Sequence, residues 1–576
     1  MGRVGIDTIV LRARRQDNRY DRPAHRGTRA AVSGEGGDGG ASGASERHRL
    51  AGRTAVVGAG TLVSRMLGLA RDAVLAALFP RAVTDAFFVA YAIPSALRQL
   101  FAEGPVQGAV LPVLAEQRRA AGDEGARRFF AALRGAWLLA VCVATAAGIA
   151  AAPTLTGLFG VHVEDGAEAY ARTVTFTRWV FLCLPLAAWA ALDMAALQAR
   201  RRFAVAAFSP AIANVAMIAA AVALPPVLAA EGQDPALALA LGAVVGATLH
   251  VVAQWPSLRR IGELARPRWQ PRHPGVREVG LRILTMGVGI GVYLVNIALA
   301  RRLLADTGEG GQSYFTWGFR LCAIPQGLFV IALATAALPT LSSLAAAREK
   351  DELARTFAFS MRLALFVAVP AAALFAALAG PLVVAFFQRG AFGPEAASET
   401  AAAVLALAPG IPSVAAIRQL APVFFAEGDT RTPVLGSVAN LAVFAGAALA
   451  LRPVLGHAGV SAAYSLANLA QALLLFVLVR RRLVRLHTAA IARACAKTGL
   501  GSAAATGAAL ALLAVLPAPA GLAGSASALG RLVPAALGTA TFAVVFVAVA
   551  WAVRSEELGA LVAAARARGR RSGSDA

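Results

Sequence analysis

Apolar segments of about 20 residues, the length that spans a bilayer as a helix, recur along this chain from Thr54 to Val553. Charged or Pro- and Gly-rich connections separate them. Only 15% of the residues are charged and the mean hydropathy is +0.64, whereas an average soluble domain has about a quarter charged residues. We therefore expect an all-α polytopic membrane protein.

The breaks between the apolar segments predict about fourteen transmembrane helices by the same length criterion. The predicted spans are 54–79, 84–116, 131–151, 173–198, 204–225, 236–256, 279–300, 313–344, 357–386, 400–426, 433–451, 458–479, 498–517 and 531–553. The domains that follow are a disordered basic N-terminal tail (1–52), an N-terminal six-helix lobe (53–260), a cytoplasmic linker (261–278), a C-terminal six-helix lobe (279–485), a final transmembrane helix pair (486–556) and a basic cytoplasmic tail (557–576).

The formal charge of +23 is distributed unevenly over the connections. Arginines and lysines cluster on alternate connections, at residues 118–128, 200–202, 259–277, 348–355 and 480–485, whereas the other connections are acidic or poor in cations. Exceptions are single residues such as Arg81, Arg389 and Arg452, and the pair Arg301 with Arg302. Because cytoplasmic loops hold the excess of Lys and Arg, we expect a multi-pass protein of the bacterial inner membrane with both termini cytoplasmic, and no nucleic-acid partner.

A short repeat relates the two predicted lobes. The segment Ala109–Leu114 recurs as Ala336–Leu341, an offset of 339 − 112 = 227 residues, and Ala213–Asn214 recurs as Ala439–Asn440 at an offset of 440 − 214 = 226. The period encloses six predicted spans, an even number, so both copies enter the membrane from the same side. Parallel repeats of this kind are a known transporter plan with the substrate site between the halves.

Charged residues lie inside the predicted spans, where each costs about 2.5–3.5 kcal/mol and usually faces a cavity or a partner. We take four arginines as candidate substrate-binding residues and three acids as cavity or gate residues: Arg65, Arg71, Arg98 and Arg320, and Asp72, Asp85 and Glu103. Arginine binds phosphate through two parallel hydrogen bonds, so this set favours a phosphate-bearing substrate, although inorganic anions would also fit. The structural alternatives are pairing of Arg71 with Asp72, pairing of Arg98 with Glu103, and capping of the second helix by Asp85.

Pro94 and the pair Gly104–Pro105 interrupt the second predicted span. Broken helices at membrane depth usually line a cavity, so these residues are candidate hinges; a tolerated kink without motion is the alternative. The chain has no Walker A sequence, and its seven histidines show no metal-ligand spacing. We expect no cofactor, and transport driven by the membrane potential or an ion gradient.

Several segments resemble the MurJ/MviN family of lipid II flippases, within the multidrug, oligosaccharidyl-lipid and polysaccharide exporter superfamily. They are Ser64–Asp72, Thr84–Ala90, Leu100–Gly104, Phe386–Gly390, Leu420–Pro422 and Asp429–Pro433. The resemblance implies two six-helix lobes and a final helix pair that alternate between inward-open and outward-open forms. It also implies cavity arginines at Arg65, Arg71, Arg98 and Arg320, with acids at Asp85 and Glu103.

The resemblance implies that the substrate is lipid II, the undecaprenyl-pyrophosphate-linked peptidoglycan precursor, with membrane lipids and other cell-wall synthesis proteins as further partners. The chain departs from the family at Ala92 and Gln99, where cations are frequent. That departure leaves export of another lipid-linked polysaccharide or of amphipathic drugs as an alternative. A membrane scaffold or an enzyme of envelope synthesis is the alternative from a different class.

Overall fold

A computed structural model describes residues 60–563, except 103, 201, 265, 271, 484–485 and 517–526. Throughout this described part the regular elements are helices, which confirms the all-α fold class. Two features explain this result: Ala and Leu favour the helix, and in hydrocarbon only a helix satisfies every backbone polar group within one segment. The predicted tail 1–52 and the candidate acid Glu103 lie outside the described residues.

The N-terminal half begins with a helix over residues 60–78. The helices that follow are α3 (Arg81–Ala102), α4 (Gly104–Ala150), α5 (Ala152–Leu158), α6 (Ala167–Phe181), α7 (Cys183–Ala199), α8 (Phe203–Ala230), α9 (Leu237–Val252) and α10 (Trp255–Arg260). We call residues 60–260 the N-lobe.

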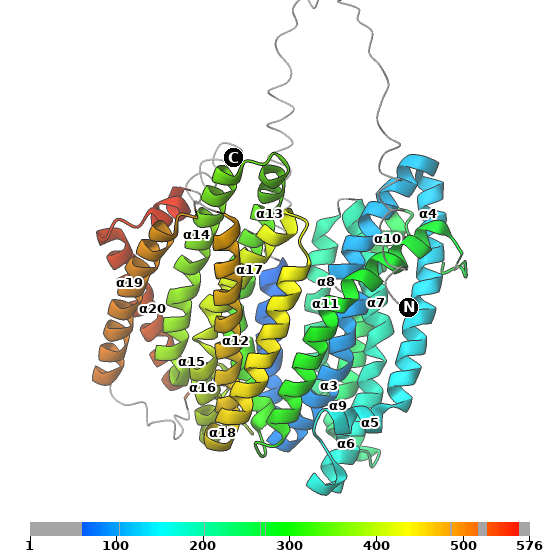
Figure 1. The fold of residues 1–576 in the computed structure, drawn as a ribbon. Coiled ribbons are helices and arrows are strands. Elements are labelled where there is room, and N and C mark those ends of the chain that lie inside the picture. Colours follow the sequence, from blue (N-terminus) through cyan, green and yellow to red (C-terminus); the bar gives the residue numbers. More distant parts are fainter. Residues whose placement is uncertain are drawn as a thin grey trace, which may run out of the picture. The chain divides into compact units, whose positions relative to one another are not determined.

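The C-terminal half follows a connection that ends at His273. Its helices are α11 (Pro274–Ala305), α12 (Gly311–Pro325), the π-helix η3 (Gln326–Val330), α13 (Ile331–Ala346), α14 (Lys350–Ala377), α15 (Ala379–Phe387), α16 (Pro394–Leu407), α17 (Gly410–Ala426) and α18 (Arg431–Arg482). We call residues 274–483 the C-lobe. The helices α19 (Thr488–Val515) and α20 (Ala528–Ala552) pack against each other beside it (Figure 1).

Each predicted span overlaps helical residues, but the predicted count of fourteen is not confirmed. By length and apolarity, 8 helices among the described residues could cross a membrane, or 9 if the pair α16 and α17, bent by 42°, forms one span. Two long helices change direction at a left-handed glycine, α4 at Gly122 (φ 65°) and α18 at Gly456 (φ 55°). Helix α18 covers the predicted spans 433–451 and 458–479, whereas α4 covers the end of the span 84–116 and nearly all of the span 131–151.

One prediction of local structure is corrected. Helix α3 continues through Pro94 to Ala102, so the predicted break at Pro94 is wrong. A short helix covers residues 556–563 at the start of the predicted basic tail, and the tail itself stays a prediction. Arg362 of α14 donates to Glu557 over 2.7 Å and pairs with Glu556 at 2.5 Å, which holds this helix against the bundle.

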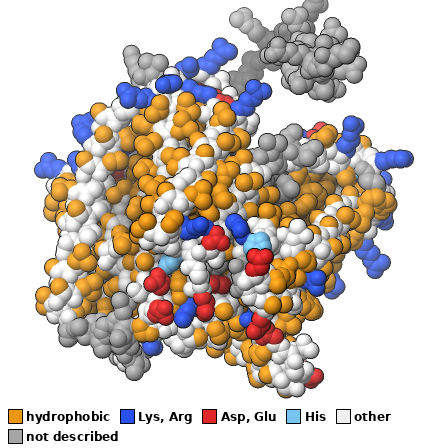
Figure 2. Space-filling model, turned by 60° about the horizontal axis from the view of Figure 1, so that its bottom comes forward, with side chains coloured by type: hydrophobic (Ala, Val, Ile, Leu, Met, Phe, Trp, Pro, Cys, Tyr) orange, Lys and Arg blue, Asp and Glu red, His pale blue; other side chains and the backbone are white. Residues whose placement is uncertain are grey.

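Charge is separated between the two ends of the helices. The end that carries the kink of α4 and helix α10, at the top of Figure 1, bears the arginine-rich connections, and we call it the basic face. The opposite end, the acidic face, comes forward in Figure 2 and shows a concentration of Asp and Glu side chains. The separation agrees with the alternation read from the sequence.

The five arginines that break the alternation each have a partner near the acidic face. Arg81 lies 3.7 Å from Glu395, and Arg452 pairs with Asp306. The other three contact groups other than carboxylates: Arg301 donates to Gln312 and Thr316, Arg302 contacts His162 over 2.5 Å, and Arg389 donates to the Ala385 carbonyl. Each of these five arginines therefore has a local partner.

The apolar core is shared at one end of the molecule and divided at the other. Towards the acidic face, a single cluster joins both lobes and the final helix pair; Phe88, Trp317 and Phe546 belong to it. Towards the basic face the core divides into two clusters, one around Phe130 that joins the N-lobe to Val279 and Ile283 of α11, and one around Phe357 in the C-lobe. In these two clusters α11 is the C-lobe helix that packs against the N-lobe.

Candidate functional site

Asp72 joins arginines from both lobes. It lies on the first helix of the N-lobe and its side chain is 1% exposed. One of its carboxylate oxygens accepts hydrogen bonds from Arg71 Nε at 3.1 Å and Arg71 Nη2 at 2.9 Å, and the same oxygen pairs with Arg320 of α12. The Arg320 guanidinium also lies 5.3 Å from the Phe88 ring centroid. We call Arg71, Asp72 and Arg320 the Asp72 cluster.

The predicted pairing of Arg71 with Asp72 is therefore confirmed, but it is part of a larger arrangement. Arg71 Nη1 donates to the Asn214 side chain of α8 over 3.1 Å. Asn214 in turn donates to the Ser64 carbonyl over 3.1 Å and to the Pro210 carbonyl over 3.4 Å. A buried carboxylate with two guanidinium partners fixes their position, so the cluster holds two cations at the junction of the lobes.

Arg65 occupies a second contact between the lobes. Its guanidinium donates to the Ala323 carbonyl of α12 over 3.4 Å. A Cβ added at Gly327, in the π-helical segment η3, would lie 1.9 Å from the Arg65 guanidinium carbon. The glycine thus leaves the room that the guanidinium fills. Arg418 of α17 is exposed and near enough to Arg65 for their charges to repel, so cations of both lobes approach each other here.

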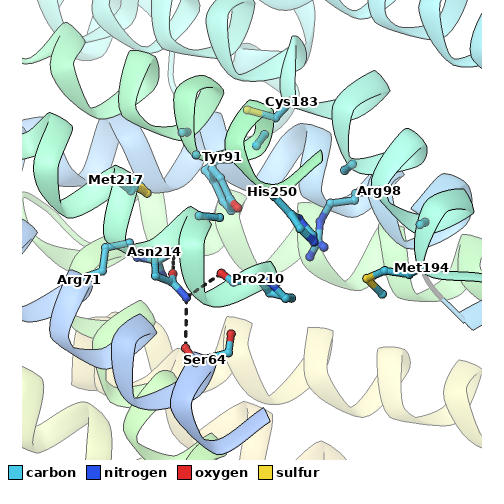
Figure 3. A pocket seen from close by; sticks show the side chains of 16 residues that line it. Ser64, Arg71, Tyr91, Arg98, Cys183, Met194, Pro210, Asn214, Met217 and His250 are labelled. Carbon is cyan, nitrogen blue, oxygen red and sulfur yellow. Dashed lines mark hydrogen bonds between the residues drawn. The ribbon is translucent and has the colours of Figure 1, made fainter. Parts of the chain in front are cut away.

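A cavity of about 560 Å³ lies inside the N-lobe (Figure 3). Its walls come from the first helix, α3, α7, α8 and α9. Arg71 and Arg98 line it, whereas Arg65 and Arg320 do not. The remaining polar groups of its lining are Ser64, Tyr91, Cys183, Asn214 and His250. The four predicted arginines are therefore divided between this N-lobe cavity and the junction of the lobes.

Asp85 connects the lobes near the acidic face. Its carboxylate accepts hydrogen bonds from the Gly310 amide at 2.6 Å and the Ser313 amide at 2.8 Å, at the start of α12. The alternative that Asp85 caps its own helix is wrong, because the helix it caps belongs to the C-lobe. Next to it, the hydroxyl oxygens of Thr84 and Ser313, both fully buried, are 2.8 Å apart. A carboxylate at a helix N-terminus is stabilised by the helix dipole.

The other predicted residues lie near these contacts or outside the description. Pro94 is buried within α3, which ends at Ala102. Helix α4 begins at Gly104, and Pro105 lies in its first turn. The hinge roles of Pro94, Gly104 and Pro105 stay predictions, as does pairing of Arg98 with Glu103.

Ala92 is 9% exposed and packs in an apolar cluster with Ile93 and Phe181, so this position does not face the N-lobe cavity.

The structure adds residues that the sequence did not indicate as site residues. Tyr91 and His250 line the N-lobe cavity together with Asn214, which the sequence indicated through the repeat alone, and Arg418 approaches Arg65. Arg418 could have been identified from the sequence, because it is a charged residue within the predicted span 400–426. Among the residues that the structure describes, no three His, Cys, Asp or Glu side chains gather as a metal site would require.

Comparisons with known proteins agree with this architecture. A model of the family described as "Lipid II flippase MurJ" matches residues 74–529. The lipid II flippase MurJ of Burkholderia cenocepacia is 30% identical over 427 residues, which cover 73% of this chain and 82% of that protein. The probable lipid II flippase MurJ of Vibrio cholerae is 33% identical over 387 residues, which cover 66% and 73%.

Solved structures show the same fold. A structure of lipid II flippase MurJ in an inward closed conformation has a TM-score of 0.68 and 18% identity, covering 86% of this chain and 99% of that one. An inward-facing multidrug resistance transporter of the MATE family, in the MOP superfamily, has a TM-score of 0.58 and 15% identity, covering 75% of this chain and 99% of that one. The helices described above are thus arranged as in membrane transporters.

Proposed function

The chain belongs to the MurJ family of lipid II flippases, and we propose from this premise that it carries lipid II from the cytoplasmic to the outer leaflet of the bacterial inner membrane by alternating access. It is a transporter with several membrane-spanning helices. The proposal extends to fourteen spans in two parallel repeats plus a helix pair, cytoplasmic termini, a membrane potential or ion gradient as the driving force, and other cell-wall synthesis proteins as partners.

The Asp72 cluster is the observation that best supports this mechanism. Asp72 and Arg71 belong to the N-lobe and Arg320 to the C-lobe, so one buried carboxylate neutralises cations from both. The pyrophosphate of lipid II is an anion of the kind that guanidinium groups bind through paired hydrogen bonds. A bound pyrophosphate competes with Asp72 for the arginines. Substrate binding would in this way change the contact between the lobes, which is the step that alternating access requires.

The distribution of packing supports closure towards the acidic face. Asp85 and Thr84 of α3 contact the start of α12 there, within the core cluster that both lobes share. Towards the basic face the core divides into two clusters, and α11 is the C-lobe helix that contributes to the cluster of the N-lobe. If the basic face is cytoplasmic, as the distribution of arginines predicts, this form closes the path to the outside. Opening that path requires the contacts between α3 and α12 to separate.

A disulfide across this contact tests the mechanism. The Thr84 and Ser313 hydroxyl oxygens are 2.8 Å apart, so cysteines at both positions are close enough to pair. We expect the double variant Thr84→Cys/Ser313→Cys, in a background without native cysteines, to replace a depleted flippase under reducing conditions and to lose lipid II flipping when oxidised. Each single cysteine variant is the control. Full flipping by the oxidised, membrane-inserted protein would contradict alternating access.

A further inference from the structure

The end of α11 near the acidic face is bonded to other helices of the C-lobe. Arg301 donates to the side chains of Gln312 and Thr316 on α12, at 3.0 and 2.9 Å. The Gln312 amide in turn donates to the Arg301 carbonyl over 2.7 Å. Asp306, directly after α11, pairs with Arg452 of α18. These contacts attach the end of α11 to the C-lobe.

The next residue along α11, Arg302, is bonded to the N-lobe instead. Its Nη1 atom lies 2.5 Å from Nε2 of His162, in the turn that follows α5. The backbones also approach closely here: Gly160 has a φ of 94°, and a Cβ added to it would lie 2.9 Å from the Arg302 Cα. Separation of the lobes at the acidic face therefore has to break the contact between His162 and Arg302.

The contact requires a neutral imidazole. Every nitrogen of an arginine guanidinium is a donor and none accepts a hydrogen bond, so Nε2 of His162 is the acceptor and Nδ1 carries the ring proton. A protonated imidazole has no acceptor left, and it places a second positive charge against Arg302. Histidine is the side chain that ordinarily titrates between pH 5 and pH 8, so a change of pH in this range is able to break the contact.

The surroundings of His162 leave the ring open to protons from the acidic face. His162 and Arg302 are both half-buried. Helix α5 presents Gly157 to the ring, and a Cβ added there would lie 3.6 Å from it. Of the acids that follow His162 in the chain, Glu164 is exposed, and Glu168 of α6 pairs with an arginine of its own helix. A cation is thus in direct contact with the ring.

We propose that His162 and Arg302 form a proton-operated latch between the lobes: the neutral imidazole holds the acidic face closed, and a proton bound from the solvent on that side releases it. The inference rests on the proposed function, since it assigns a proton to the opening step of alternating access. Acidification then favours the form that is open at the acidic face. Asp85 is a second titratable group between the lobes at this face, so the test has to distinguish it from His162.

The test measures the separation of the lobes rather than transport. Gln233 of the N-lobe and Ser398 of the C-lobe are exposed near the acidic face. Spin labels are attached at Gln233→Cys and Ser398→Cys in the full chain without its native cysteines, in lipid vesicles, and pulsed electron paramagnetic resonance gives their distance. A histidine with an ordinary pKa of about 6.5 that binds a proton only when the lobes are apart raises the ratio of open to closed forms about fourfold between pH 8 and pH 6. We expect this shift towards the longer distance.

Four variants assign the shift to the latch. His162→Gln keeps a neutral acceptor for Arg302 but cannot titrate, so it should keep the shorter distance at both pH values. His162→Arg is a permanent cation and should show the longer distance at both. Arg302→Gln removes the repelled charge and should lose the pH response. His457→Gln is the matched control, because His457 contacts Glu399 within the C-lobe; it should respond as the unchanged protein does.

The outcomes separate the latch from the proposed function. An equal pH response in His162→Gln and the unchanged protein would overturn the inference and assign the response to another group, such as Asp85. No response in the unchanged protein, or the shorter distance in His162→Arg at both pH values, would overturn it as well. Lipid II flipping is measured in the same vesicles. A protein whose lobes respond to pH through His162 but which does not flip lipid II would contradict the proposed function and leave the latch in place.

Discussion

The N-lobe and the C-lobe each carry an asparagine at matching positions of the repeat predicted from the sequence, but the two asparagines contact different partners. Asn214 of α8 accepts a hydrogen bond from Arg71 on the first helix of the N-lobe, at 3.1 Å. Asn440 of α18 accepts one from Asn296 on α11, the first helix of the C-lobe, also at 3.1 Å. In each lobe a side chain of the first helix donates to the asparagine. The donor is a cation in the N-lobe and a neutral amide in the C-lobe.

The difference extends to the other charged positions. At the offset of 227 residues, Arg65 corresponds to Val292 and Arg71 to Ala298, and in the opposite direction Arg320 corresponds to Ile93. The repeat predicted from the sequence therefore does not extend to these cations. A single anionic head group needs only one set of donors, so two lobes related by such a repeat would not both need to carry them.

Removing Asp72 should have the largest effect, because the C-lobe has no corresponding charge. In Asp72→Ala two guanidinium groups face each other without their carboxylate, and loss of one partner from a buried ion pair costs about 3–5 kcal/mol. Since the Arg320 side chain is 27% exposed, we expect the lower end of that range. Thermal unfolding of the purified protein measures the stability, and complementation of a flippase-depleted strain measures the function, which should be abolished.

The variant Asp72→Asn is the matched control, because it keeps the shape and one neutral acceptor. It should lose less stability than Asp72→Ala but should still transport poorly, since the balance of charge between the lobes has changed. Normal complementation by Asp72→Ala at normal membrane abundance would show that the Asp72 cluster has no part in transport.

The two asparagines give a direct comparison of the lobes, with an intermediate effect. Asn214→Ala removes an acceptor from a charged donor, which is worth about 1.5–3 kcal/mol, whereas Asn440→Ala removes a bond between neutral amides, worth about 0.5–1.5 kcal/mol. We expect Asn214→Ala to be the less stable variant and to impair flipping more strongly. Equal losses in both assays, or a larger loss in Asn440→Ala, would mean that the cation in the N-lobe does not distinguish the two sites.

From the sequence we could predict which residues take part in this comparison better than which contacts they make. The apolar segments and the offset between Asn214 and Asn440 are visible along the chain, and the cost of a charge in a span identified Arg71, Asp72 and Arg320. The partner of Asp85 was not predictable in the same way, because residues 225 and more positions away supply it. His250 carries no formal charge, so the rule that found the arginines could not find it. Packing between the lobes decides which helices face each other, and local sequence patterns do not predict this packing.

The smallest expected effect is at the basic face of the C-lobe and appears as a pH dependence. The Thr432 hydroxyl and amide donate to Asp429 at the start of α18, and Arg482 pairs with it; together they hold the pKa of that carboxyl below its usual range. A carboxyl whose pKa is lower in the folded protein than in the unfolded chain stabilises the folded protein. The stabilisation is complete at pH values above the unfolded pKa of about 3.9, and it is lost as the pH falls below that value towards the pKa of the folded protein. We therefore expect acidification below about pH 4 to loosen the connection between α17 and α18, measured as faster hydrogen exchange at the amides of Arg431 and Thr432 after correction for the intrinsic rate.

The variant Asp429→Asn isolates this contribution, because it keeps an acceptor oxygen but cannot titrate. At neutral pH its two amides should exchange faster than those of the unchanged protein, and acid should add little further. The N-lobe provides the internal reference: the Arg118 and Arg200 pairs with Glu263 lie on the same face but do not involve Asp429, so exchange around them should be identical in the two proteins at every pH. An equal acid response of Asp429→Asn and the unchanged protein at Thr432 would assign the loosening to other carboxyls, and the C-lobe would then have no acid-sensitive contact of its own at this face.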